Sequence, residues 1–286
     1  IYSNYSNTKI MDLKVAISST SGGIGIILDK GANYSYIQNV SSVNNYGDAI
    51  RILSDYNIIN QSLFGFGMMN AISLVSSSNN VFIDSQSLGN SGGADIILSG
   101  ISTNNVLINC SYDILKESVA AGSQLIRKWY YRAYVNDTKG LPIPNANVSA
   151  FNRTNGIEFL NLRTNQTGWT NITTITDYVN TGGIRNFYSN YTINASTGSL
   201  RDEHKYNVTL MQNNLKDVFT LKVWSYVPEI VYISDLNGRC GSGACPEGIV
   251  QPSDRALSAG GVATEKFFKF YAYSSAGLAA LPTGIL

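Results

Sequence analysis

The sequence predicts an all-β protein in which a short parallel β-helix is followed by β-sandwich domains. A motif recurs every 22 to 27 residues over the first part of the chain, and after about residue 120 it gives way to longer alternating strands. The density of Gly, Asn and β-branched residues disfavours helices throughout. We expect three domains, at 1–124, 125–225 and 226–286.

The repeated motif is clearest in "SNNVFIDS" (78–85) and "TNNVLINC" (103–110), and looser copies lie at 6–13, 32–39 and 55–62. Aligning the copies produces one apolar column, Ile10, Ile37, Ile59, Phe82 and Leu107. Two residues earlier lies a polar column, Thr8, Ser35, Asn57, Asn80 and Asn105. Because stacked turns place equivalent residues above one another, we expect an apolar stack and a ladder of asparagine amides.

A second strand precedes the motif in four of the turns, at 23–27, 49–53, 71–75 and 94–98. Period-2 alternation predicts that Arg51 and Ser73 point away from the core. The residues expected to point into the core are Ile24, Ile26, Ile50, Ile52, Ile72, Leu74, Ile96 and Leu98.

Over roughly residues 1–115 the motif resembles the right-handed parallel β-helix (NosD-like) repeats of microbial surface proteins. The regular leucine pattern of leucine-rich repeats, which share the period, is absent. The resemblance implies an architecture only, because that fold hosts lyases, adhesins and spacers alike.

The aromatic stretch "LIRKWYYRAYVND" (125–137) begins a different pattern, with strands about every ten residues. In the second strand Ala146, Val148 and Ala150 alternate with polar residues, which predicts that Asn147 lies on the non-core face. Further strands are expected at 156–164, 168–176, 190–196, 205–212 and 218–224.

This region resembles the carboxypeptidase-regulatory-like or Ig-like modules of secreted proteins. The matching positions are Asp137, Gly140, Pro142, Ile143, Ala146, Val148, Thr164 and Gly168. The resemblance implies a structural spacer, and no catalytic residue carries over. A β-helix followed by such a module is similar to the domain order of large archaeal cell-surface proteins. Residues 226–286 are expected to open a second, incomplete sandwich whose unpaired edge accepts a strand from a partner.

The composition favours an extracellular protein. Charged residues make up 14% of the chain and the net charge is +1, without a basic run, so a nucleic-acid partner is not expected. Thirteen Asn-x-Ser/Thr sequons occur, where chance predicts roughly five or six. The glycosylation candidates are Asn33, Asn60, Asn136, Asn147, Asn152, Asn165, Asn171, Asn190, Asn194 and Asn207.

Two of the three cysteines, Cys240 and Cys245, close the short loop "CGSGAC" and are candidates for a disulfide. The alternative is that these two cysteines bind a metal ion, but neither a second cysteine pair nor a histidine lies nearby to complete the site. Cys110 is expected to be a buried, inert thiol. No apolar segment is long enough for a membrane span. The chain begins without Met or a signal peptide, and we expect it to be a processed or partial piece of a longer protein.

Residues that could carry chemistry are few. The single histidine, His204, lies in "RDEHKY" and is expected in a solvated turn. Asp235 and Asn237, with Glu247, form only an incomplete calcium-type loop, and the aromatic run at Trp129 is expected to belong to a core or an interface. The carboxylates of the β-helix are Asp12, Asp48, Asp55, Asp84 and Asp95, which are expected at corners or several turns apart.

We therefore expect a non-enzymatic extracellular structural protein without a cofactor or metal, part of a cell-surface layer, stalk or filament. Its expected partners are further copies of itself, other cell-surface proteins and glycans. The alternatives are a carbohydrate-binding or adhesive module and a polysaccharide-active β-helix enzyme.

Overall fold

The computed structural model describes residues 1–16, 22–43, 45–87, 89, 92–154 and 156–223, together with two strands at 271–274 and 277–280. The chain divides into two units, Ile1–Trp224 and Ser225–Leu286. Within the described residues every element is a β-strand except a 3-10 turn, η1 (Ile114–Lys116). The all-β prediction is therefore confirmed for these residues.

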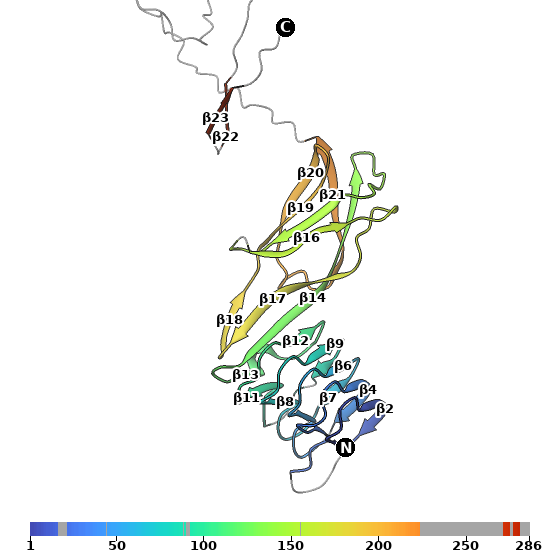
Figure 1. Cartoon of the computed structure of the whole chain (residues 1–286), viewed down its shortest axis with the longest axis vertical. Coiled ribbons are helices and arrows are strands. Elements are labelled where there is room, and N and C mark those ends of the chain that lie inside the picture. The colour runs from blue at the N-terminus through green and yellow to red at the C-terminus, as the bar shows by residue number, and fades with distance from the viewer. Residues whose placement is uncertain are drawn as a thin grey trace, which may run out of the picture. The chain divides into compact units, whose positions relative to one another are not determined.

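The first part of the chain is a parallel β-solenoid of about five turns (Figure 1). One face is a six-stranded sheet in the order β1-β3-β5-β8-β11-β13, in which every neighbouring pair is parallel. Each turn contributes one strand to this sheet, as the repeat predicts. The strands are β1 (Tyr2–Ser3), β3 (Ile26–Leu28), β5 (Ile50–Ile52), β8 (Ile72–Val75), β11 (Ile96–Ser99) and β13 (Glu117–Val119).

The second face carries the repeated motif, and all of its neighbouring strands are also parallel. A third, shorter row of parallel pairs begins on the second halves of β2 and β4 and continues through β7 and β10. The strands of these two faces are β2 (Lys9–Val15), β4 (Tyr36–Val43), β6 (Ile58–Asn60), β7 (Leu63–Gly65), β9 (Val81–Ile83), β10 (Gln86–Ser87) and β12 (Asn105–Ile108).

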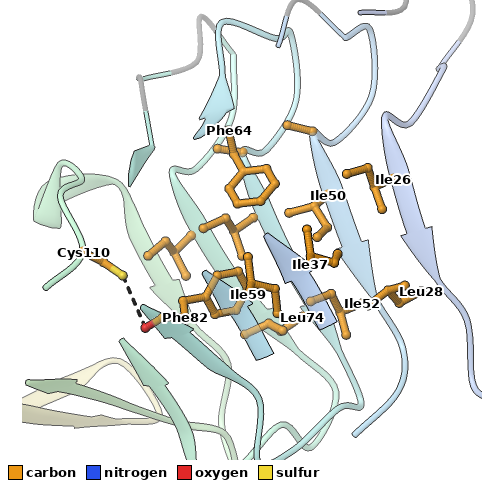
Figure 2. Close-up of a cluster of buried hydrophobic side chains, with 14 of the residues drawn as sticks. Ile26, Leu28, Ile37, Ile50, Ile52, Ile59, Phe64, Leu74, Phe82 and Cys110 are labelled. Carbon is orange, nitrogen blue, oxygen red and sulfur yellow. Dashed lines mark hydrogen bonds between the residues drawn. The ribbon is translucent and has the colours of Figure 1, made fainter. Parts of the chain in front are cut away.

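The predicted apolar column fills the solenoid. Ile37, Ile59 and Phe82 are completely buried and lie in successive registered strands (Figure 2). The facing sheet supplies two further columns, which run through Ile50 and Ile52. The first turn differs from the prediction by two residues, because Ile26 and Leu28, rather than Ile24 and Ile26, align with them. Ser73 registers with Arg51 and therefore lies on the opposite side of the sheet from Ile72 and Leu74, as predicted, although its small side chain is covered.

An asparagine ladder lies beside the apolar column, as the repeat predicts. The Asn80 side-chain oxygen accepts hydrogen bonds from both the backbone and the side-chain nitrogen of Asn57, each at 2.9 Å. Asn105 accepts in the same way from Asn80, at 3.0 and 3.1 Å. All three residues are fully buried, and these bonds satisfy polar groups that would otherwise destabilise the interior.

The corners of the solenoid require left-handed backbone at equivalent positions in successive turns. One corner is occupied by Asn7, Tyr34, Tyr56, Asn79 and Asn104, with φ values between 55° and 61°. Another is occupied by Asp12, Asn39, Gln61, Asp84 and Asn109, with φ values between 46° and 54°. Asparagine and aspartate tolerate this conformation better than other non-glycine residues, which explains why the repeats are rich in them.

One strand belongs to both parts of the first unit. β14 (Gln124–Asp137) begins as a further rung of the solenoid, where Leu125–Lys128 pair in parallel with β12. On its other edge this first half of β14, Gln124–Tyr131, pairs with β17 (Thr173–Thr181) in antiparallel orientation. The second half, Tyr131–Asp137, pairs in parallel with β21 (Asn214–Val223). Figure 1 shows β14 leading from the last turn into the second set of strands.

A second apolar core lies among these later strands and includes Tyr131, Tyr191, Tyr206 and Phe219, all fully buried. The predicted strands at 146–151, 156–164, 190–196 and 218–224 are confirmed within a few residues, and that at 168–176 begins later. The remaining strands are β15 (Asn147–Phe151), β16 (Ile157–Arg163), β18 (Ile184–Phe187), β19 (Tyr191–Thr197) and β20 (Leu200–Tyr206).

The strand predicted at 205–212 is wrong. β20 ends at Tyr206, and the backbone then turns, with the Met211 amide donating to the Asn207 carbonyl at 2.9 Å. The Asn207 side-chain oxygen also accepts from the Leu210 amide, at 3.2 Å. Such local side-chain bonds compete with strand pairing.

In the second unit the described strands β22 (Tyr271–Ser274) and β23 (Gly277–Ala280) form an antiparallel pair. The predicted strand at 231–234 and the rest of this expected domain lie outside the described residues.

Candidate functional site

The carboxylates of the solenoid serve the backbone and the corners rather than converging on one point. Asp48 is buried and forms a 2.7 Å salt bridge with Arg51, and it also accepts from the Asn70 amide groups one turn away. Asp95 accepts from the backbone of Asp113, and Asp55 accepts from the backbone of Ser78. Among the described residues no three of the His, Cys, Asp and Glu side chains are grouped so that they could hold a metal ion.

Asp12 and Asp84 belong to a ladder along one left-handed corner. Asn39 donates its side-chain amide to Asp12 at 2.8 Å, and Asn109 donates to Asp84 at 2.6 Å. Asn213, which lies just before β21 and is itself left-handed, adds a further rung by donating to Asn109. The ladder thus continues from the solenoid into the second set of strands.

A cluster of polar side chains lies where the solenoid meets β17 and β18. The Glu117 side chain on β13 is fully buried and accepts hydrogen bonds from the hydroxyls of Tyr112 (2.6 Å) and Tyr178 (2.5 Å). It also accepts from the Asn180 amide at 2.5 Å and from the Arg185 guanidinium at 2.9 Å. One carboxylate therefore joins the end of the solenoid to two strands that follow it by about sixty residues.

The electrostatics of this cluster favour the ionised carboxylate. Burial alone would raise the pKa of Glu117, but the four hydrogen bonds that it accepts lower its pKa below the usual value. Burial raises the pKa of Tyr112 and of Tyr178, and the negative charge of Glu117 adds to both shifts. Both tyrosines are therefore neutral donors, and neither is poised to act as a base near neutral pH.

A buried cation closes the C-terminal end of the solenoid core. Arg127 on β14 registers with Leu107, so it occupies the next position of the apolar column. Its guanidinium carbon lies 4.6 Å from the Trp129 ring centroid and within 6 Å of the Tyr112 and Tyr178 ring centroids. Cation–π contacts of this kind stabilise a desolvated guanidinium.

The counter-charge of Arg127 comes from a β-bulge. Tyr178 pairs with Arg127 and Thr176 pairs with Lys128, which leaves Asp177 as the extra residue of β17. The bulge turns the Asp177 side chain inward, where it is fully buried and lies 3.7 Å from Arg127. Asp177 also accepts from the Trp129 indole at 3.2 Å and from the Thr209 hydroxyl at 2.7 Å.

The prediction that His204 lies in a solvated turn is wrong. The residue lies on β20, opposite Ile193, and its ring stacks on Phe219 with centroids 4.4 Å apart. Its Nε2 atom lies 3.1 Å from the buried Asp217 carboxylate, which also accepts from the Tyr131 hydroxyl at 2.6 Å. The hydrogen bond to Asp217 raises the pKa of His204.

This raised pKa predicts a small pH dependence of stability. The folded state holds the proton of His204 more tightly than the unfolded state, so the contribution is complete below the unfolded pKa and is lost as pH rises through the folded pKa. We expect the free energy of unfolding to fall by less than about 1 kcal/mol between about pH 6 and about pH 8, because the His204 side chain is partly exposed and solvent screens its interaction with Asp217.

Urea denaturation across this pH range, with His204→Gln as the comparison, checks the prediction. His204 is the only histidine of the chain, so the variant should lose most of this slope. An unchanged slope in the variant would contradict the assignment.

The aromatic residues pack mainly against one another. Trp129 and Tyr131 are buried in the second core, as predicted. Tyr34 and Tyr56 are exposed at one solenoid corner, and their rings stack with centroids 5.1 Å apart and planes 10° apart. Each of these two rings therefore covers one face of the other, which leaves less ring face open for a sugar.

The asparagines divide sharply by burial. All thirteen sequon asparagines lie in the described residues, and none of them is buried. The prediction that Asn147 lies away from the core agrees with its intermediate exposure, although its side-chain oxygen is buried without a hydrogen-bond partner. The buried asparagines of the described residues are all outside sequons: Asn45, Asn57, Asn80, Asn105 and Asn180.

Only one of the three cysteines, Cys110, lies in the described residues. Cys110 is buried, as predicted, and its thiol lies 3.5 Å from the Phe82 carbonyl oxygen (Figure 2). Burial raises its pKa to about 12, so it is a poor nucleophile at neutral pH. Cys240 and Cys245, and the candidate calcium ligands Asp235, Asn237 and Glu247, lie outside the described residues.

The fold and its junction define a β-solenoid that shares one strand with a second β-structure and is closed by a buried charged and aromatic cluster. No protein-family model, curated protein or solved structure matches the chain. The described part contains no helix long and apolar enough to cross a bilayer.

Proposed function

We propose that the chain is a non-enzymatic, glycosylated structural protein of the cell surface, a subunit or fragment of a layer, stalk or filament. The observation that carries this proposal is the distribution of asparagine: none of the thirteen sequon asparagines is buried, and the buried asparagines of the described residues lie outside sequons. A glycan needs an accessible amide, and N-glycosylated positions are typical of secreted proteins.

The arrangement of polar groups supports a structural role. The carboxylates of the solenoid are engaged in corner ladders or in bonds to backbone amides. The buried carboxylate of Glu117 joins the solenoid to the later strands and is enclosed by neutral tyrosines and an arginine. In this proposal the later strands form an Ig-like spacer, as the archaeal-type cell-surface proteins that the sequence resembles would have.

Electron microscopy of the native material, combined with mass spectrometry of its glycopeptides, tests the proposal. We expect filaments or sheets whose subunits carry glycans at several sequons. Unglycosylated single particles would contradict it.

The alternatives predict different results. An adhesive module would be monomeric and would retain a sugar on a glycan array. A polysaccharide-active enzyme would degrade a polymer and lose that activity when one carboxylate pair is changed.

A further inference from the structure

The thirteen sequons differ in whether an oligosaccharyltransferase could reach and modify them in the folded chain. Transfer requires access to the asparagine amide nitrogen and to the hydroxyl two residues later. The hydroxyl-bearing residue is buried in three sequons, at Ser35, Ser62 and Ser149. These burials close the sequons of Asn33, Asn60 and Asn147 while the fold is intact.

In three further sequons the asparagine amide or the hydroxyl donates a hydrogen bond to a carboxylate. The amide nitrogens of Asn39 and Asn109 donate to Asp12 and Asp84 in the corner ladder. In the sequon of Asn207, the Thr209 hydroxyl donates to the buried Asp177 at 2.7 Å. A transferase acting on these positions must first break a hydrogen bond to a carboxylate.

The sequons of Asn152 and Asn165 each form the same kind of turn, in which the side-chain amide nitrogen that would receive the glycan makes no hydrogen bond to the described residues. The Asn165 side-chain oxygen accepts from the Thr167 amide, the Thr167 hydroxyl and the Trp169 amide at 2.8 to 3.0 Å. The Asn152 oxygen accepts from the Thr154 amide, the Thr154 hydroxyl and the Gly156 amide over the same range. Both threonines are exposed, and neither asparagine amide nitrogen donates a hydrogen bond to the described residues.

These two turns flank an open strand. β16 (Ile157–Arg163) pairs with β15 on one side and ends the sheet on the other. Two of its apolar side chains, Ile157 and Leu160, are 62% and 49% exposed. An open edge with apolar side chains is a site for unwanted strand addition, and Asn152 and Asn165 lie just before and just after it.

We propose that Asn152 and Asn165 are N-glycan acceptors of the folded chain and that their glycans shield the open edge of β16. The inference rests on the proposed extracellular function. In each transfer the asparagine amide nitrogen forms a bond to the anomeric carbon of a lipid-pyrophosphate-linked oligosaccharide. The bond from that carbon to the phosphate oxygen breaks, the lipid pyrophosphate leaves with the electron pair, and a carboxylate of the transferase takes the amide proton.

The test uses the full chain, produced without glycans, folded, and then incubated with an oligosaccharyltransferase and its lipid-pyrophosphate-linked oligosaccharide. Glycopeptide mass spectrometry measures the occupancy of each sequon. We expect Asn152 and Asn165 to be modified at least about tenfold faster than Asn39 and Asn109, the factor that one hydrogen bond to a carboxylate provides. Equal rates at these four positions would overturn the inference.

A pair of variants at Asp12 separates local geometry from sequence preference. Asp12→Gly suits the left-handed backbone and removes the acceptor of the Asn39 amide, so the modification of Asn39 should rise toward that of Asn165. Asp12→Asn keeps an acceptor oxygen and should leave Asn39 slow. No difference between the two variants would overturn the role given to the ladder.

The shielding role has its own measurement. Sedimentation velocity should show that Asn152→Gln/Asn165→Gln, treated with the same transferase, self-associates more than the treated wild-type protein. Adding Leu160→Lys, which places a charge on the open edge, should reverse that association. Equal association of all three proteins would overturn the shielding role. Native material without any glycan would instead overturn the proposed function. The test with the added transferase is independent of that outcome, because it measures only which sequons of the folded chain can be modified.

Discussion

Replacing Phe82 with alanine is expected to lower the free energy of unfolding by about 3–5 kcal/mol. Phe82 is completely buried in the column between Ile59 and Leu107, and its ring packs edge-to-face against Phe64 with centroids 6.5 Å apart. The neighbouring turns are tied by backbone and asparagine ladders, so they cannot close the resulting cavity fully. Urea denaturation measures the loss.

Val81→Ala is the matched control, because Val81 lies on the same strand and points away from the core. This substitution removes two methyl groups from a half-exposed position and should cost less than about 1 kcal/mol. A loss for Phe82→Ala no larger than that for Val81→Ala would contradict the assignment of Phe82 to the centre of the solenoid.

Asp177→Asn is expected to cost about 3–5 kcal/mol, although asparagine has nearly the same shape. The substitution removes the charge that faces Arg127, and the guanidinium is then buried without its counter-ion. Its cation–π contacts with Trp129 and Tyr178 compensate for only part of the lost interaction. The free energy of unfolding, measured at about pH 7, should report this loss.

The double variant Arg127→Met/Asp177→Asn tests the cause. Removing both charges leaves no uncompensated ion, so the double variant should return to within about 1–2 kcal/mol of the wild-type protein. Losses that simply add in the double variant would show that the two residues do not interact across the bulge.

The regular part of the fold was predictable because it is repeated. Each turn supplies an independent copy of the same pattern, so the columns through Phe82 and Asn80 follow from alignment of the sequence with itself. The first turn was predicted two residues out of register. In "GIGIIL" (23–28), alternation fits both Ile24 with Ile26 and Ile26 with Leu28 as the inward pair. Only the pairing with Ile50 and Ile52 selects Ile26 and Leu28.

The junction was not predictable in the same way. Glu117 and Arg127 meet Tyr178 and Asp177, residues more than 45 positions further along the chain, and a non-repeated contact leaves no trace in an alignment of repeats. One signal was present: Arg127 shares the inward alternation of Leu125, Trp129 and Tyr131. A charged residue on the core face of a strand indicates a buried partner, but the bulge that supplies Asp177 has no local sequence mark.

His204 shows a related limit. The charged run "RDEHKY" has the composition of a turn, yet it pairs with β19 as a strand. The carboxylate of Asp217 then gives His204 a hydrogen-bond partner in the fold. The sequon pattern was visible at once, whereas the difference between Asn165 and Asn39 depends on which side-chain atoms are already bonded.

The shared strand β14 also limits how this protein could change during evolution. Domains joined by a linker can be exchanged or spaced apart by inserting residues between them. A single residue inserted between Lys128 and Trp129 would instead reverse the inward and outward alternation of the rest of β14. Tyr131 and Ala133 would then turn out of the second core. Gene fusion or shuffling at this junction would therefore have to preserve the length of β14, so the solenoid and the strands that follow it are inherited as one piece.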